Sequence, residues 1–160
     1  MILPPQSRLL VFEEMEYKGN TISRNPKLLC FDIYKDYEYY ILSLDAHPTA
    51  YIAVRKDDKM YGLGLSELDE TPVYCHGGFT YADKILTGSN YRWVNEYEDK
   101  WVIGWDYGHH RDWTTLLPED IQKEYGFKKW TTGEIIKECH EVIDSIIEYN
   151  KNGGLKWGSF

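Results

Sequence analysis

The arrangement of apolar and polar residues in the amino-terminal half of the chain favours β-strands. Residues 8–17 alternate loosely between apolar and charged and are followed by KGN, so an early strand entering a hairpin is predicted. Residues 28–33 and 37–44 are rich in β-branched and aromatic residues, and YKD separates them. Because the residue before Pro48 is pushed towards extended geometry, DAHP ends the second run. An antiparallel meander is expected.

Three more strands are predicted further along the chain, at residues 50–54, 73–81 and 101–105. The last of these is apolar on both faces, which is typical of a central strand. Residues 56–69 are charged and contain glycine, so they are expected to form a long surface loop.

The carboxy-terminal part has the period of an amphipathic helix. Thr131 and Glu134 have the spacing of a capping box, and NKNGG supplies the stop. A shorter helix is predicted for residues 118–125, and His140, beside the apolar stripe, is interpreted as structural. The apolar face consists of Ile135, Ile136, Cys139, Val142, Ile143, Ile146 and Ile147. The predicted fold class is α+β, a mostly antiparallel twisted sheet with one amphipathic C-terminal helix packed on it.

Length and composition narrow the class of protein. The chain has 160 residues, 42% of them hydrophobic and 16% aromatic, so a single globular domain spanning residues 1–160 is predicted. Acidic residues outnumber basic ones by 26 to 18, the net charge is -8, and no basic run is present, which disfavours direct binding of nucleic acid. Such acidity usually serves solubility, although an acidic protein can also occupy a basic groove on a partner.

The cysteines and the start of the chain bear on location. Cys30, Cys75 and Cys139 are odd in number and widely spaced, so they are interpreted as buried free thiols in a reducing compartment. The opening MILPPQSRLL lacks the features of a signal peptide, and no stretch has the length of a membrane span. A cytoplasmic protein with no membrane partner is expected.

Residues 74–81, YCHGGFTY, place polar and flexible residues in a strand-like run. A double glycine, Gly77 and Gly78, marks a bulge or a place where a ligand or another backbone comes close. His76 is then expected to point into a cavity, with the Thr80 hydroxyl on the same side. A hydrogen-bonded histidine at a strand kink is an equally good interpretation.

A second polar group follows the strand at residues 101–105. Asp106, His109 and Asp112 recur at intervals of three beyond Gly108, where a strand gives way to a loop. Imidazole and carboxylate ligands suit zinc, manganese or iron, but the spacing fits no standard zinc pattern, so neither a metal nor a cofactor is assigned. Hydrogen bonding to a small molecule is the alternative. The neighbouring Arg111 offers a planar fork that recognises phosphate or carboxylate.

Acid–base catalysis is also open, because a carboxylate beside a histidine fixes its tautomer. Nucleophilic catalysis by Cys75 is disfavoured, since on a strand its side chain would face away from His76.

Three segments together resemble a family of small uncharacterised proteins common in phages and prophages of Gram-positive bacteria. They are AYIAVRKDDKMYG, VYCHGGFTYA and WVIGWDYGHHRDW, and they resemble the family's GYVGVPKGHPLYG, VHGGLTYA and WWFGFDCAHAGD. The resemblance covers residues 50–147 and implies a shared fold and a phage setting. The chain departs from the family at Asp58 and Lys59, where the family has His-Pro, and at His110 and Arg111, where it has Ala-Gly. Any chemistry that needs the missing histidine would require Asp58 in its place.

The leading hypothesis is a phage-encoded binding protein of the host cytoplasm. It would hold a small polar, nucleotide-derived ligand in a pocket walled by Tyr61 and Trp105. By binding such a ligand, the protein would sequester a host immune signal. The residues expected to grip the ligand are His76, Gly77, Gly78, Thr80, Asp106, His109 and Asp112. The alternatives are a hydrolase, either metal-assisted or His/Asp-dependent, and an acidic inhibitor of a host nucleic-acid-binding defence protein.

Overall fold

The protein is built around one antiparallel sheet. The computed structural model describes residues 27–44, 46–84 and 100–152, and five strands in these ranges pair in the order β1-β2-β3-β5-β4. The strands are β1 (Lys27–Tyr34), β2 (Tyr37–Ser43), β3 (Pro48–Val54), β4 (Tyr81–Asp83) and β5 (Trp101–Asp106). The helices are α2 (Leu65–Leu68), α3 (Glu119–Glu124) and α4 (Thr132–Asn152).

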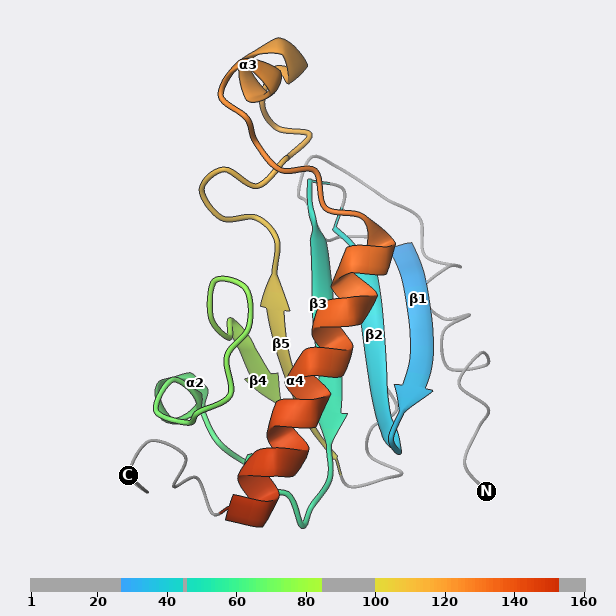
Figure 1. The fold of residues 1–160 in the computed structure, drawn as a ribbon, viewed down its shortest axis with the longest axis vertical. Helices are drawn as coiled ribbons and strands as arrows, with labels where there is room; N and C mark the ends of the chain where they lie inside the picture. The colour runs from blue at the N-terminus through green and yellow to red at the C-terminus, as the bar shows by residue number, and fades with distance from the viewer. Residues whose placement is uncertain (1–26, 45, 85–99, 153–160) are drawn as a thin grey trace.

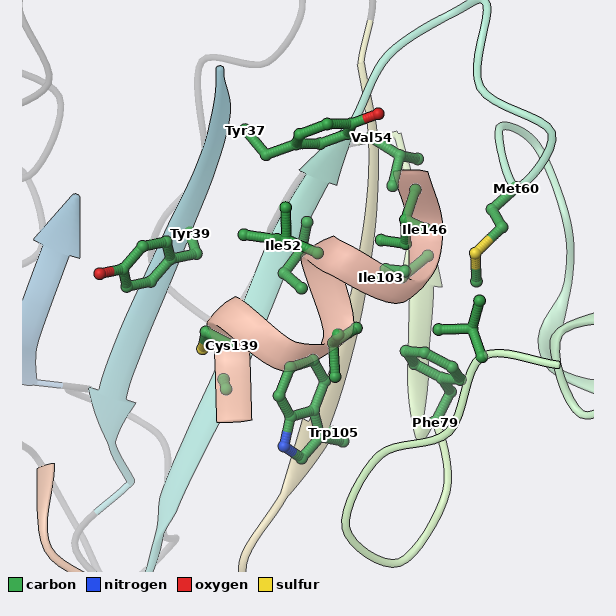
Figure 2. Packing of buried hydrophobic residues seen from close by; sticks show 14 of the residues in the cluster. Tyr37, Tyr39, Ile52, Val54, Met60, Phe79, Ile103, Trp105, Cys139 and Ile146 are labelled. Atoms are coloured by element: carbon green, nitrogen blue, oxygen red, sulfur yellow. The ribbon is translucent and has the colours of Figure 1, made fainter. Parts of the chain in front are cut away.

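The long helix α4 crosses one face of the sheet (Figure 1). Its buried stripe, which includes Ile135, Cys139 and Ile146, packs on alternate residues of β2, β3 and β5. Figure 2 shows Ile52, Ile103 and Trp105 pointing from the strands towards the helix. Thr131 and Glu134 form the predicted capping box, with the Thr131 N–H donating to Glu134 (2.9 Å) and the Glu134 N–H to the Thr131 hydroxyl (3.2 Å). The α+β fold is thus confirmed.

The opposite face of the sheet is also buried, at Tyr40, Leu42, Tyr51, Ala53 and Val102. Apolar residues on both faces of β5 agree with its place between β3 and β4.

The β1–β2 hairpin turns at two residues with positive φ, Lys35 (49°) and Asp36 (71°). This is the backbone of a two-residue type I′ turn, whose twist matches that of the strands. YKD is therefore a tight hairpin, as the meander requires.

The predicted strand at residues 73–81 is wrong for most of its length. Gly77 and Gly78 both have positive φ (70° and 85°), and the Gly78 N–H donates to the Cys75 carbonyl at 3.0 Å. Two successive left-handed residues reverse the chain and prevent strand geometry. Pairing with β5 begins only at Tyr81, in the short strand β4.

The predicted surface loop at residues 56–69 is partly buried and contains α2. Met60 and Leu68 are completely buried in the core on the helix face of the sheet. Asp58 is 6% exposed, and its carboxylate accepts hydrogen bonds from the Tyr37 hydroxyl (2.5 Å) and the Asn150 amide (2.7 Å). This loop therefore joins the end of α4 to the sheet.

The predicted strand at residues 8–17 lies outside the described residues. No described helix is long and apolar enough to cross a membrane.

Candidate functional site

The turn at residues 75–78 meets the loop that follows β5. His76 projects from the turn and His109 from the loop, and their ring centroids lie 5.6 Å apart in an edge-to-face arrangement. The loop begins at the end of β5 that Figure 1 shows on the same side as α3, and its start is fixed by the Tyr107 N–H, which donates to the Pro48 carbonyl at 3.0 Å. Two segments far apart in the sequence therefore share one polar cluster.

Asp112 lies at the centre of this cluster and is only 5% exposed. Its Oδ2 accepts hydrogen bonds from His76 Nε2 (2.8 Å) and from the His109 N–H (3.0 Å), and its Oδ1 accepts one from Trp130 Nε1 (2.9 Å). Burial opposes ionisation of this carboxyl, but the three hydrogen bonds outweigh it and lower the pKa of Asp112. The carboxylate is therefore ionised near neutral pH.

An ionised carboxylate has no proton to donate, so His76 Nε2 must carry the proton in the His76–Asp112 pair. When the ring is neutral, its Nδ1 is therefore an acceptor. Asp112 in this way fixes the tautomer and orientation of the imidazole.

Other side chains hold His76 from three directions. Its ring stacks on Tyr107 (centroids 4.9 Å apart, 7° between planes) and packs against Trp130 (4.9 Å, 59°). Its backbone N–H donates to Glu138 Oε2 at 2.8 Å, and the Tyr107 hydroxyl donates to Oε1 of the same carboxylate. Burial raises the pKa of Tyr107, and the hydrogen bond to Glu138 raises it further, so Tyr107 stays protonated and remains a donor.

Gly77 is required where it lies because the His109 ring rests against its backbone. A Cβ on Gly77 would lie no more than 2.8 Å from three atoms of that ring. The double glycine thus provides the close approach that its sequence suggested, and the approaching group is an imidazole from β5's loop.

The same ring has an unusual nitrogen environment. His109 Nε2 is buried and lies 3.3 Å from Asp106 Oδ1, yet it forms no aligned hydrogen bond with any described residue. Asp106 is engaged instead by the Thr80 hydroxyl (3.0 Å) and the Gly108 N–H (2.9 Å). Buried polar atoms are almost always paired in folded proteins, so this nitrogen marks an incompletely satisfied site.

A cleft of about 500 Å³ opens beside the cluster. This histidine cleft, as we call it, is lined by residues that include His47, His109, His110, Arg111, Leu117 and Phe127. Asp112 also reaches its wall, with both carboxylate oxygens directed to the donors described above. The cleft combines apolar walls with nitrogen donors.

Arg111 occupies a strained backbone position in the wall of this cleft. Its φ is 74°, in the left-handed region that costs a non-glycine residue about 1–2 kcal/mol. The Asp112 N–H donates to the His109 carbonyl (3.0 Å) and the Lys128 N–H to the Arg111 carbonyl (2.9 Å), so the backbone is held on both sides. The exposed Arg111 side chain makes no hydrogen bond or ion pair with the described residues.

Two of the residues expected to wall the ligand lie elsewhere. Trp105 is 1% exposed in the core, and its Nε1 donates to the Tyr107 hydroxyl (3.0 Å), so it supports the cluster from behind. Tyr61 lies against Trp101, at the opposite end of β5 from Asp106. Asp58 is equally remote: it bonds Asn150, twelve residues and about 18 Å along α4 from Glu138.

Four site residues escaped the sequence-based reasoning, namely His47, Tyr107, Trp130 and Glu138. Glu138 is on the polar side of α4, where a carboxylate gives no signal, and Trp130 precedes the helix by two residues. His47 was detectable only as part of the DAHP break.

Catalysis by Cys75 finds no support in the chemistry of its thiol. Burial, with a contribution from Glu138, raises the pKa of Cys75, so its thiolate is disfavoured. All three cysteines are free. Among the described residues, no group of three or more His, Cys, Asp or Glu side chains is placed to hold a metal ion.

Comparisons of the chain with protein-family models, with curated proteins and with solved structures found no match.

Proposed function

We propose that the protein binds a small anionic, phosphate-bearing ligand in the histidine cleft, with Arg111 as its anchor. The observation that carries the proposal is the Arg111 guanidinium, which has no hydrogen-bonding or ionic partner among the described residues and is held by a left-handed backbone beside a cleft of about 500 Å³. Residues in such backbone conformations persist where the surroundings enforce them, and they cluster at ligand sites.

The chemistry of the walls supports an anion. The guanidinium fork binds phosphate or carboxylate through two parallel hydrogen bonds. His109 and His110 line the same cleft as Arg111, and Phe127 and Leu117 supply the apolar surface that small-molecule sites commonly have. The cleft volume lies within the usual range for such sites.

A nucleotide-derived ligand is the specific form of this proposal. In the phage setting that the resemblance implies, sequestration of a host immune signal is the purpose that we propose for such binding.

Calorimetry with nucleoside mono-, di- and cyclic phosphates, and with inorganic phosphate, tests the proposal. Arg111→Ala is expected to weaken binding about tenfold or more, because a hydrogen-bonded charge pair contributes about 1.5–3 kcal/mol. Lys137→Ala is the matched control, since Lys137 is an exposed cation on α4 outside the cleft. Failure of every anion to bind below millimolar concentration, or equal effects of the two substitutions, would contradict the proposal.

A second candidate function is a His/Asp-dependent hydrolase, which the His76–Asp112 pair favours. Because Nε2 of His76 carries the proton that it donates to Asp112, Nδ1 can accept a proton from a water molecule while that water attacks a substrate. Hydrolysis of the same nucleotides, measured with and without added divalent metals, tests this function. His76→Asn should abolish turnover, and absence of turnover by the unmodified protein under both conditions would eliminate the enzyme.

A further inference from the structure

A second cavity adjoins the histidine cleft. It has a volume of about 330 Å³, and its lining includes His47, Pro48, Trp113, Glu119, Lys129 and Trp130. We call it the tryptophan cavity. His47 lines both spaces.

The position of His47 is fixed from two sides. Its ring lies against Gly108, where a Cβ would come within 2.6 Å, and its Nδ1 lies 3.1 Å from the Pro48 carbonyl. The Thr115 N–H donates to the Ala46 carbonyl at 3.2 Å. This hydrogen bond joins the segment around Thr115 to the residues that connect β2 to β3. The two spaces are therefore adjoining compartments with a fixed common wall.

We propose that the tryptophan cavity binds the planar heteroaromatic ring of the ligand, while the anionic group lies in the histidine cleft on the other side of His47. This inference rests on the proposed function, and it narrows the ligand from any small anion to a nucleotide. The two compartments differ in lining and share a wall at His47, so together they suit a molecule with a ring at one end and a phosphate at the other.

The lining of the tryptophan cavity matches a nucleobase. Trp113 supplies an indole face, and Lys129 Nζ lies 5.5 Å from its centroid, a loose cation–π contact that leaves the ring able to stack. Glu119 can accept a hydrogen bond from an exocyclic amine or ring N–H, and Lys129 can donate one to a ring carbonyl. Stacking on an aromatic side chain is the usual way in which proteins hold an unpaired base.

Trp130 has a different role in the same cavity. Its Nε1 is bonded to Asp112 Oδ1, and Lys128 Nζ lies 4.6 Å from its ring centroid. It therefore joins the wall of the tryptophan cavity directly to the His76–Asp112 pair, and Trp113 is the better position for a selective substitution.

The experiment compares four probes by calorimetry: a nucleoside monophosphate, the corresponding nucleoside, ribose 5-phosphate and inorganic phosphate. For the unmodified protein, the nucleotide should bind at least tenfold more tightly than ribose 5-phosphate. Trp113→Ala should weaken nucleotide and nucleoside binding about tenfold and leave ribose 5-phosphate unchanged, because loss of one base–aromatic stack weakens binding by about 5- to 150-fold. Trp113→Phe, which keeps an aromatic face, should retain most of the affinity.

The outcomes separate this inference from the function on which it rests. If phosphates bind in an Arg111-dependent way but Trp113→Ala affects all four probes equally or none of them, the ring site is refuted and the anion site stands. If the nucleoside binds through Trp113 but no phosphate gains affinity from Arg111, the ring site stands and the anion site is refuted. Failure of all four probes to bind overturns both.

Discussion

The contact between Gly77 and His109 allows the free-energy cost of backbone strain to be distinguished from the cost of a steric clash. Gly77→Ala should destabilise the protein by about 2–4 kcal/mol, whereas Gly78→Ala should cost about 1 kcal/mol. Both residues have positive φ, so alanine at either position lowers the free energy of unfolding by about 1 kcal/mol, because the left-handed region is unfavourable for a residue with a Cβ. Only at Gly77 does the new methyl group also meet the His109 ring, and overpacking of this kind costs a further 1–3 kcal/mol or so.

The neighbouring glycine is a close control because it differs mainly in its surroundings. An added Cβ on Gly78 meets one atom within 4 Å, Asp69 Oδ1 at 4.0 Å, which is ordinary contact. Urea unfolding followed by the fluorescence of the six tryptophans gives the free energy of unfolding of each variant.

A double-mutant cycle with His109→Ala then identifies the cause. Without the imidazole, the methyl group at position 77 has space, so Gly77→Ala should cost no more than Gly78→Ala in that background. Equal costs for the two glycine substitutions in the unmodified protein would refute the reasoning. So would a cost of Gly77→Ala that is the same with and without the His109 ring.

Three further predictions concern the polar groups around this contact. Asp112→Asn should destabilise the protein by about 2–4 kcal/mol at pH 7, since three partly buried donors lose their charged acceptor. Because folding lowers the pKa of Asp112, the stability that its carboxylate adds is present above about pH 4 and is lost as the pH falls through the folded-state pKa. The difference in unfolding free energy between Asp112→Asn and the unmodified protein, measured in urea, should therefore shrink from about pH 5 to about pH 3. A difference that stays constant would contradict this. Asn150→Ala should cost about 1–3 kcal/mol in the same assay because it removes a donor to the buried Asp58, whereas Asn152→Ala, on the exposed end of α4, should change stability by less than about 0.5 kcal/mol. Arg111→Gly should be more stable than Arg111→Ala by about 1 kcal/mol in thermal or urea unfolding, although both lose ligand binding, because only glycine is unstrained at φ 74°; equal stabilities would argue against the strain.

Long, regular patterns in the sequence predicted most of the fold. The period of α4 over residues 132–152 expresses one buried helix face, and the continuous aromatic and β-branched runs of β2, β3 and β5 express strands that are buried on both faces, so these patterns are readable without tertiary information. The β4 segment was misplaced because its three residues carry no periodicity of their own. Its pairing comes from β5, which is a tertiary effect.

The candidate site was predictable only in part, and the reason is again the range of the interactions. The intervals of three between Asp106, His109 and Asp112 reflect one local loop, and local spacing is visible in a sequence. Glu138 and Trp130 join the site because α4 packs where it does, and no pattern near either residue indicates that contact. Tertiary packing also decides that Tyr61 lies outside the site, because its neighbour Trp101 is at the far end of β5.

The backbone strain at Arg111 is best explained by its side chain. Among the described residues, three that are not glycine have positive φ, and Lys35 and Asp36 are accounted for by the type I′ hairpin, which needs that conformation at both positions. Arg111 lies in no hairpin, and the turn around it would form more easily with glycine. The chain instead has there a long cationic side chain that makes no hydrogen bond or ion pair with the described residues and lines the histidine cleft. No hydrogen bond or ion pair of the Arg111 side chain with the described residues offsets this backbone strain, and this is why we propose that its guanidinium binds a ligand.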